Sequence, residues 1–186
     1  MSDLTFNPNH TLWVEKYRPS TINDCIVPDR VKDILNKFVE NGDFPCLMLS
    51  GTAGIGKTTV AKALTSDIGM NTMVINVSKN RGIDTLRTTI ESFATTVSLD
   101  GGIKCIILDE FDGATEILQK ALRADMEEYA INCRFIITCN HPNRIIDAIH
   151  SRSTAVDVSV ANDEIMDICK QFLNRTIEIL KNEGVS

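Results

Sequence analysis

The segment "GTAGIGKT", Gly51 to Thr58, carries the clearest chemical pattern of the chain. It satisfies G-x-x-x-x-G-K-[S/T], in which glycines let successive backbone N–H groups turn inward around phosphate oxygens. We expect Lys57 to bind the β- and γ-phosphates of a nucleotide and Thr58 to offer its hydroxyl to Mg²⁺. The residues of this loop that we predict to bind nucleotide are Thr52, Ala53, Gly54, Ile55, Gly56, Lys57, Thr58 and Thr59.

Two carboxylates follow a second apolar run, "CIILDEFD", about 50 residues after the loop. Asp109 is placed to hold the magnesium, directly or through water, and Glu110 to polarise the attacking water. An acidic pair after a strand is common by itself, and the phosphate loop is what gives this pair its meaning. The next apolar run ends at Asn140, which either orients that water or contacts the γ-phosphate, with a plain turn asparagine as the simpler alternative.

Short apolar runs alternate with helical patterns along the chain. The runs cover 46–50, 73–77, 103–109, 133–139 and 154–158, and the helical patterns cover 29–40, 57–68, 82–97, 115–129, 143–149 and 163–182. Unbroken apolar strands separated by helices are typical of a parallel sheet that is covered on both faces. We therefore predict a three-layer α/β domain with a five-stranded parallel sheet over residues 1–160, and the first helix of a separate helical subdomain over 161–186.

The last helical pattern is amphipathic, and Asn162 or Asp163 is expected to cap its start. Its apolar side chains fall broadly on one face: Ile165, Ile168, Phe172, Ile177 and Leu180.

Composition favours an intracellular protein. The 186 residues carry a formal net charge of -6, which argues against a chain coated in cations for nucleic acid but allows a local basic surface. Neither a signal peptide nor an apolar run long enough to cross a bilayer is found. The six cysteines contain no C-x-x-C pair, so zinc-ligand spacing is missing and buried, reduced thiols are expected.

Several motifs occur together in one order, and the set resembles the AAA+ clamp-loader ATPases. More narrowly, it is similar to the small subunits of replication factor C and to the clamp-loader ATPase subunit of tailed bacteriophages. The resemblance covers almost the whole chain, from about residue 12 to 185. The segments that carry it are "WVEKYRPSTINDCIVP", "GTAGIGKTT", "NVSKNRGIDTLR", "ILDEFD", "LQKALRADMEEYAINCRFIITCN" and "IIDAIHSRS".

The resemblance implies roles for two residues that are ambiguous alone. Asn140 matches the sensor asparagine of the family, and Arg152 matches an arginine finger that acts in trans on the ATP of the neighbouring subunit. The family's "SRC" reads "SRS" here, so Ser153 replaces the usual cysteine. The family's "ALRR" reads "ALRA", so Ala124 stands where a second arginine is usual.

The resemblance also implies where the adenine of ATP lies. The N-terminal segment of the family packs against the base, and the matching residues here are Val14, Glu15, Lys16, Tyr17 and Ile26. The preference for adenine rests on this resemblance alone.

The stretch "NVSKNRGIDTLR" gathers cations at the expected start of a helix, which in the family lines a ring chamber that tracks the DNA backbone. A solvated helix end is the simpler alternative. We expect phosphate contacts without base reading, through side chains and the helix N-terminus. The predicted DNA-binding residues are Lys79, Arg81, Gly82, Ile83 and, one to two turns further, Arg87.

The function implied is that of an ATP-hydrolysing clamp-loader subunit in DNA replication, with ATP and Mg²⁺ as ligands. Its expected partners are other subunits of a ring, a sliding clamp and primer–template DNA, with no membrane. The expected location is the cytoplasm, or the nucleus for a eukaryotic version. Two alternatives stay open at this point: an AAA+ helicase loader, and a ring scaffold that binds nucleotide without hydrolysing it.

Overall fold

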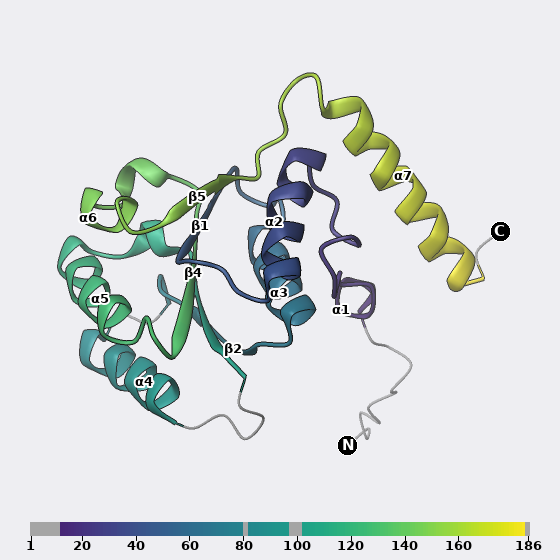
Figure 1. Ribbon diagram of the computed structural model, residues 1–186. Helices are drawn as coiled ribbons and strands as arrows, with labels where there is room; N and C mark the ends of the chain where they lie inside the picture. Colours follow the sequence, from purple (N-terminus) through teal and green to yellow (C-terminus); the bar gives the residue numbers. More distant parts are fainter. Residues whose placement is uncertain (1–11, 80–81, 97–101, 185–186) are drawn as a thin grey trace, which may run out of the picture.

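The computed structural model describes residues 12–79, 82–96 and 102–184 (Figure 1). Five strands form one parallel sheet in the order β2-β3-β4-β1-β5. Their bounds are β1 Leu47–Ser50, β2 Asn71–Asn76, β3 Lys104–Asp109, β4 Cys133–Cys139 and β5 Thr154–Asp157. The predicted fold class and the number of strands are confirmed.

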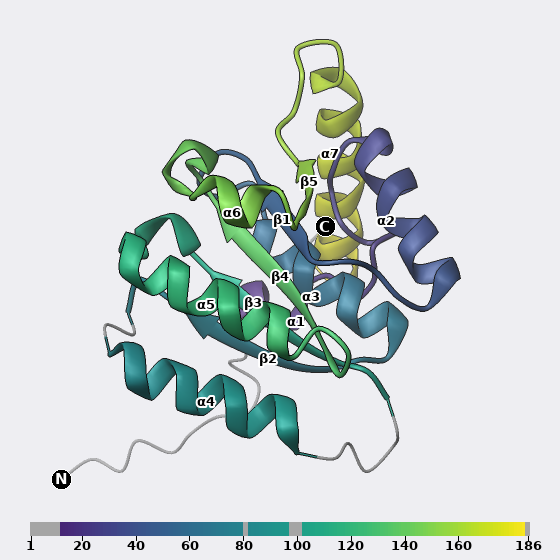
Figure 2. The ribbon, with the colours of Figure 1, turned by 60° about the vertical axis from the view of Figure 1, so that its left-hand side comes forward.

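Helices cover both faces of the sheet. In Figures 1 and 2, α4, α5 and α6 lie on one face, while α2 and α3 lie on the other. Each face has its own cluster of buried apolar side chains, and the alternating residues of the strands supply both. The helices are α1 Trp13–Lys16, α2 Asp29–Asn41, α3 Lys57–Ile68, α4 Ile83–Thr95, α5 Glu116–Glu128, α6 Asp147–His150 and α7 Ile165–Asn182.

Local signals in the sequence fix the ends of the helices near the site. Helix α3 begins directly after Gly56, whose backbone φ of 94° lies in the left-handed region, and it ends at Gly69 with φ 78°. Helix α5 begins after Thr115, whose hydroxyl accepts a hydrogen bond from the N–H of Leu118. These caps set where α3 begins after the phosphate loop and where α5 begins on the opposite face of the sheet.

The single helix predicted over 143–149 is wrong. A 3-10 turn, η2 Pro142–Arg144, and the short α6 replace it. Ile145 and Ile146 between them are extended, and the N–H of Ile146 donates to Oε1 of Gln119, a buried side chain of α5. Because this N–H donates to a side chain, it makes no backbone hydrogen bond of a helix, and the helical pattern is interrupted at Ile146.

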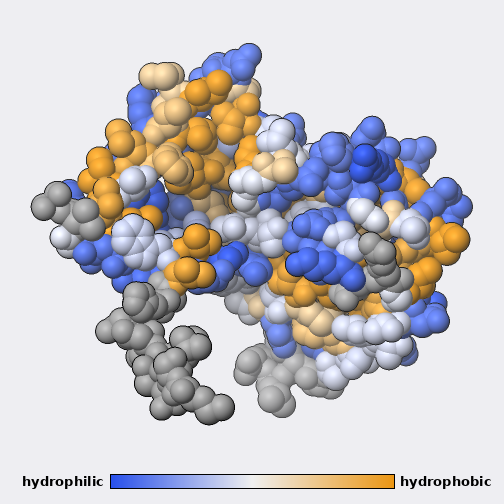
Figure 3. All heavy atoms as spheres, turned by 180° about the vertical axis from the view of Figure 1, so that it is seen from behind, coloured by the Kyte–Doolittle hydropathy of each residue, from blue (hydrophilic) through white to orange (hydrophobic). Residues whose placement is uncertain are grey.

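Helix α7 lies on the outer side of α2, away from the sheet (Figure 1). None of its residues is buried, and its exposed apolar side chains form part of the hydrophobic surface in Figure 3. They are Ile165, Met166, Phe172, Leu173 and Ile177.

The predicted cap of α7 at residue 162 or 163 is also wrong. Glu164 stands at the N-cap and makes no side-chain bond to the helix. Its carboxylate instead accepts from the N–H of Ala161 and from Arg30 of α2, so the start of α7 is tied to the core domain.

All six cysteines have free thiols, in agreement with the expected absence of disulfides. Four are buried, Cys46 is half-buried, and Cys169 on α7 is exposed, so the expectation of buried thiols fails for Cys169. Over the described residues, no helix is both long and apolar enough to cross a membrane.

Candidate nucleotide site

A cavity of about 290 Å³ opens where β1, β3 and β4 end and α3 begins. In an open parallel sheet, this carboxyl edge is the usual place for a ligand. The lining brings together residues from three separate segments of the chain: Ala53, Gly54, Gly56, Lys57, Thr58, Thr59, Asp109, Glu110, Thr138, Cys139 and Asn140. Of the predicted loop residues, Thr52 and Ile55 are outside this lining.

The loop between β1 and α3 uses its glycines for backbone shape. Gly54 has φ 79° and Gly56 has φ 94°, a region that residues with a Cβ rarely adopt. Gly51 is needed for close packing as well, because a Cβ there would lie 3.1 Å from Cγ2 of Val158. The outward side of the loop stays open, which leaves room for phosphate groups.

Lys57 lies at the base of the cavity and is only 8% exposed. Its ammonium donates to the carbonyls of Gly51 (3.0 Å) and Thr52 (2.8 Å) and to Oδ1 of Asn140 (2.7 Å). Burial lowers the pKa of this lysine from its ordinary value of 10.5. The Asn140 contact joins the phosphate loop to the end of β4.

Asp109 is held by two hydroxyl groups. Oγ1 of Thr58 donates to its Oδ1 at 2.5 Å, and Oγ1 of Thr138 donates to the same oxygen at 2.7 Å. The second carboxylate oxygen has no partner among the described residues. A hydroxyl and a carboxylate this close fit Mg²⁺, which takes one or two protein oxygens and fills its other positions with water and phosphate.

Glu110 is the only non-glycine residue among those described that has a positive φ, 55°. A side chain in this left-handed region costs roughly 1–3 kcal/mol, and such residues cluster at functional sites. Its backbone N–H donates to Thr138, and its carboxylate accepts from the hydroxyl of Ser78, which also lies 2.9 Å from Oδ1 of Asn76. The hydrogen bond from Ser78 lowers the pKa of Glu110, and a smaller contribution in the same direction comes from a hydrogen bond to Asn76.

Arg152 lies outside the cavity, in the turn between α6 and β5. Its guanidinium pairs with Glu127 of α5 and donates to the carbonyl of Ala148 at 2.9 Å. The same turn holds Ser153, whose Oγ lies 3.4 Å from the thiol of Cys46. The structure therefore separates Arg152 from the other predicted catalytic residues of this chain.

The segment predicted to meet adenine lines a second hollow, of about 470 Å³, between the N-terminal segment, α3 and α7. Val14, Tyr17 and Thr59 line it together with Trp13, Arg18, Pro19 and Ile179.

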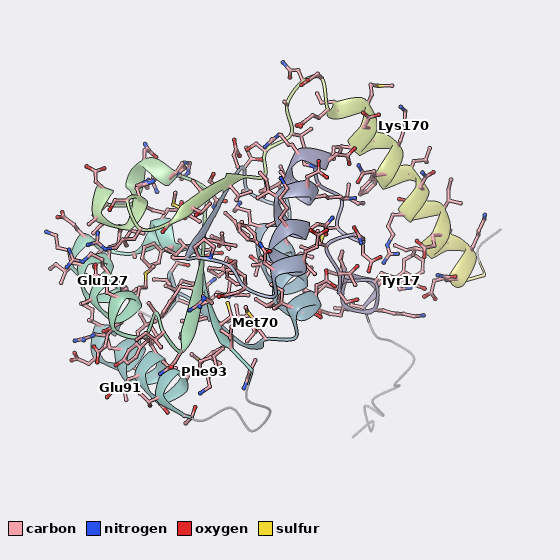
Figure 4. All side chains as sticks on the ribbon, in the orientation of Figure 1. Tyr17, Met70, Glu91, Phe93, Glu127 and Lys170 are labelled. Carbon is pink, nitrogen blue, oxygen red and sulfur yellow. The ribbon has the colours of Figure 1, made fainter. Side chains whose placement is uncertain are left out.

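Three charged or polar side chains of this segment already have side-chain partners within the chain. Glu15 pairs with Arg18 at 2.6 Å, and Glu183 beyond α7 accepts from Lys16 at 2.5 Å and from Tyr17 at 2.7 Å. Figure 4 labels Tyr17 beside the far end of α7. Ile26 does not join them, because it lines a separate hollow with Lys32 and Gln171.

The predicted DNA-binding residues fall at the start of α4. Gly82 precedes the helix and Ile83 begins it, and Lys79 is exposed, whereas Arg81 lies outside the described residues.

Arg87 has a different environment from the one expected. Its guanidinium binds both oxygens of Asp125 on α5, at 2.8–3.1 Å, and this carboxylate is 1% exposed. Turning Arg87 wholly toward DNA would leave a buried charge unpaired, which is costly. Its first role is therefore to join α4 to α5.

Residues 47–161 match the family described as the ATPase family associated with various cellular activities (AAA). This span is more than half of the chain and contains the whole cavity described above. The chain belongs to the AAA family. This family is one of ATPases.

Relatives of this AAA domain carry names from DNA replication. The chain is 43% identical over 150 residues to the replication factor C small subunit of Methanoregula boonei, and this alignment covers 77% of this chain and 47% of the relative. It is 39% identical over 187 aligned positions to the sliding-clamp-loader large subunit of Enterobacteria phage T4, covering 98% and 58%. The chain thus spans about half the length of these relatives.

Solved structures support the fold. The Thermotoga maritima RuvB Holliday junction branch migration motor superposes with a TM-score of 0.64 at 18% identity, covering 83% of this chain and 53% of that one. At this identity the likeness concerns the AAA architecture alone.

Sequence reasoning missed Thr138 and Ser78. Thr138 is the polar residue near the end of an apolar strand, two positions before Asn140, and this position was its only signal. Ser78 lies beyond β2, and only the pairing of β2 with β3 brings it to Glu110. Gly113 also permits this approach, because a Cβ there would lie 3.0 Å from Cβ of Ser78.

Replacing Ser78 by alanine should raise the pKa of Glu110 toward its ordinary value of 4.5, because the main hydrogen bond to the carboxylate is lost. The folded pKa is depressed, so the stabilising effect of this bond is present above 4.5 and disappears as the pH falls through the lowered pKa. Carbon-13 NMR titration of the Glu110 carboxyl measures the shift. Ser66→Ala, at an exposed serine of α3, is the matched control; an equal midpoint in Ser78→Ala and wild type would contradict this role.

Proposed function

We propose that this AAA domain is the ATP-hydrolysing part of a subunit that opens a sliding clamp and places it on primer–template DNA. The observation that carries the proposal is the convergence of Lys57, Thr58, Asp109, Glu110 and Asn140 at one sheet edge. The names of the relatives supply the biological process. A scaffold that only binds nucleotide would not need an intact glutamate and asparagine beside the loop.

Lys57 would exchange a carbonyl partner for the β- and γ-phosphates, because a charged acceptor makes the stronger hydrogen bond. Backbone N–H groups of the loop and of the first turn of α3 would bind the remaining phosphate oxygens. Thr58 and Asp109 would hold Mg²⁺, which when bound neutralises charge on the phosphates. The base would enter the second hollow, against Val14 and Tyr17.

Glu110 would accept a proton from the attacking water, and Asn140 would orient that water or the γ-phosphate. In the state described, the Glu110 carboxylate is bound by Ser78, so it must turn away from Ser78 before it can act as a base.

Residues 161–186 would begin the helical lid of a longer subunit. The complex would act at replicating DNA, in the cytoplasm or nucleus.

Arg152 would act on the nucleotide of the neighbouring subunit, since its own subunit places it outside the cavity. An arginine acting in trans contributes about 10³–10⁵ in rate in related phosphoryl-transfer enzymes. Arg152→Ala should therefore leave ATP binding by the separate chain unchanged and reduce hydrolysis by the assembled complex by at least a hundredfold.

A mixing experiment measures whether the site is shared. Lys57→Ala subunits retain Arg152, and Arg152→Ala subunits retain the phosphate loop, so mixed complexes should recover part of the ATPase rate that each variant lacks alone. The ATPase rate of the mixture is the readout. Efficient hydrolysis by single subunits, with no effect of Arg152→Ala, would refute the shared site.

Lys79 and the N-terminus of α4 would bind phosphates of the DNA backbone. Lys79→Ala should weaken binding of primer–template DNA by the complex and reduce the slope of log affinity against log salt by about one unit. Lys120→Ala, at an exposed lysine of α5, is the control of equal charge change. An unchanged slope for Lys79→Ala, measured by fluorescence anisotropy over a salt series, would assign Lys79 to the solvated surface.

A further inference from the structure

Arg152 is bound on two sides by its own subunit. Its Nε pairs with the carboxylate of Glu127 on α5, while Nη1 donates to the carbonyl of Ala148 at 2.9 Å and to Oγ of Ser151 at 3.2 Å. Nη2 has no partner among the described residues. Figure 4 labels Glu127 on α5, and Figures 1 and 2 show α6, the helix just before Arg152, next to α5.

We propose that Glu127 is a positioning residue, which orders Arg152 so that the free end of its guanidinium faces the nucleotide of the adjacent subunit. This inference rests on the proposed role of Arg152 in trans. Sequence reasoning gave Glu127 no role, because a glutamate on an exposed helix face is usually a solvated residue.

The exposure of this ion pair decides whether Glu127 orders Arg152 for its role or holds it back from the nucleotide. The Arg152 side chain is 43% exposed and the Glu127 side chain is 42% exposed. Ion pairs between side chains this exposed are weak. A phosphate group that carries more negative charge than a carboxylate would compete easily for the guanidinium. Glu127 therefore cannot block Arg152, but it can limit the many rotamers of a free arginine, whose ordering is costly.

A second arginine completes the arrangement. Nε of Arg123, one turn before Glu127 on α5, lies 3.6 Å from the same carboxylate oxygen and has no hydrogen-bond partner among the described residues. When Arg152 shifts toward a phosphate, Arg123 stays beside Glu127. The carboxylate then keeps a counter-charge and does not repel the incoming phosphates as an unpaired anion would.

Helix α5 is a firm support for this contact. The pair between Arg87 and the buried Asp125 ties α5 to α4, and Leu122 and Met126 are buried in the core below it. Groups that position a reacting side chain work best on rigid elements that are themselves held by neighbours. Glu127 thus presents Arg152 from a helix with a fixed place in the domain.

The test uses Glu127→Gln in the assembled complex. The maximal ATPase rate should fall about tenfold, as expected when a long side chain must be ordered during the reaction, while KM and ATP binding by the separate chain stay unchanged. Glu128→Gln, the next residue of α5, makes the same charge change without an ion pair to Arg152 and should stay within twofold of wild type. Equal thermal unfolding of both variants checks the fold.

A double-mutant cycle separates positioning from other effects. Glu127→Gln should cause no further loss in complexes that already carry Arg152→Ala. A tenfold loss in that background too, or a Glu127→Gln complex as fast as or faster than wild type, would overturn the proposal. If Arg152→Ala itself hydrolyses ATP at the wild-type rate, the role of Arg152 in trans fails, and the positioning role fails with it.

Discussion

The site depends on one carboxylate, Asp109, and on the two hydroxyl groups that hold it. Thr58 comes from the start of α3 and Thr138 from β4, so one oxygen at the end of β3 joins three segments of the chain. Parallel pairing of β3 with β4 makes this meeting possible, because it brings their carboxyl ends to the same edge. The donation from Glu110 N–H to Thr138 then extends the same network to the candidate base.

The two faces of the sheet carry different features of the domain. One face carries α2, α3 and the hollow lined by Val14 and Tyr17, whereas the other carries α4 and α5, where carboxylates hold two arginines. Asp125 binds Arg87 and Glu127 binds Arg152. The cavity and Arg152 lie at separate places on the domain, which supports the proposal that a neighbouring subunit supplies the arginine for hydrolysis.

Much of this arrangement could be predicted from the sequence. The apolar runs predicted all five strands to within two residues, and β1, β3 and β4 are buried on both faces, which leaves the clearest signal. The split of the predicted helix 143–149 could not be foreseen, since it depends on a bond from Ile146 to the distant Gln119. The same holds for Ser78 and Glu127, because Ser78 binds Glu110, 32 positions further along the chain, and Glu127 on α5 binds Arg152 in the turn between α6 and β5.

We propose that Asp109 and Thr58 make the affinity for ATP depend on Mg²⁺. Calorimetric titration with ATP, with and without Mg²⁺, tests it most directly in wild type and Asp109→Asn. We predict that wild type binds ATP at least tenfold more tightly with Mg²⁺, and that the variant loses most of this difference while keeping its fold, because the amide carries no charge for the metal. An equal effect of Mg²⁺ in both proteins would contradict the account.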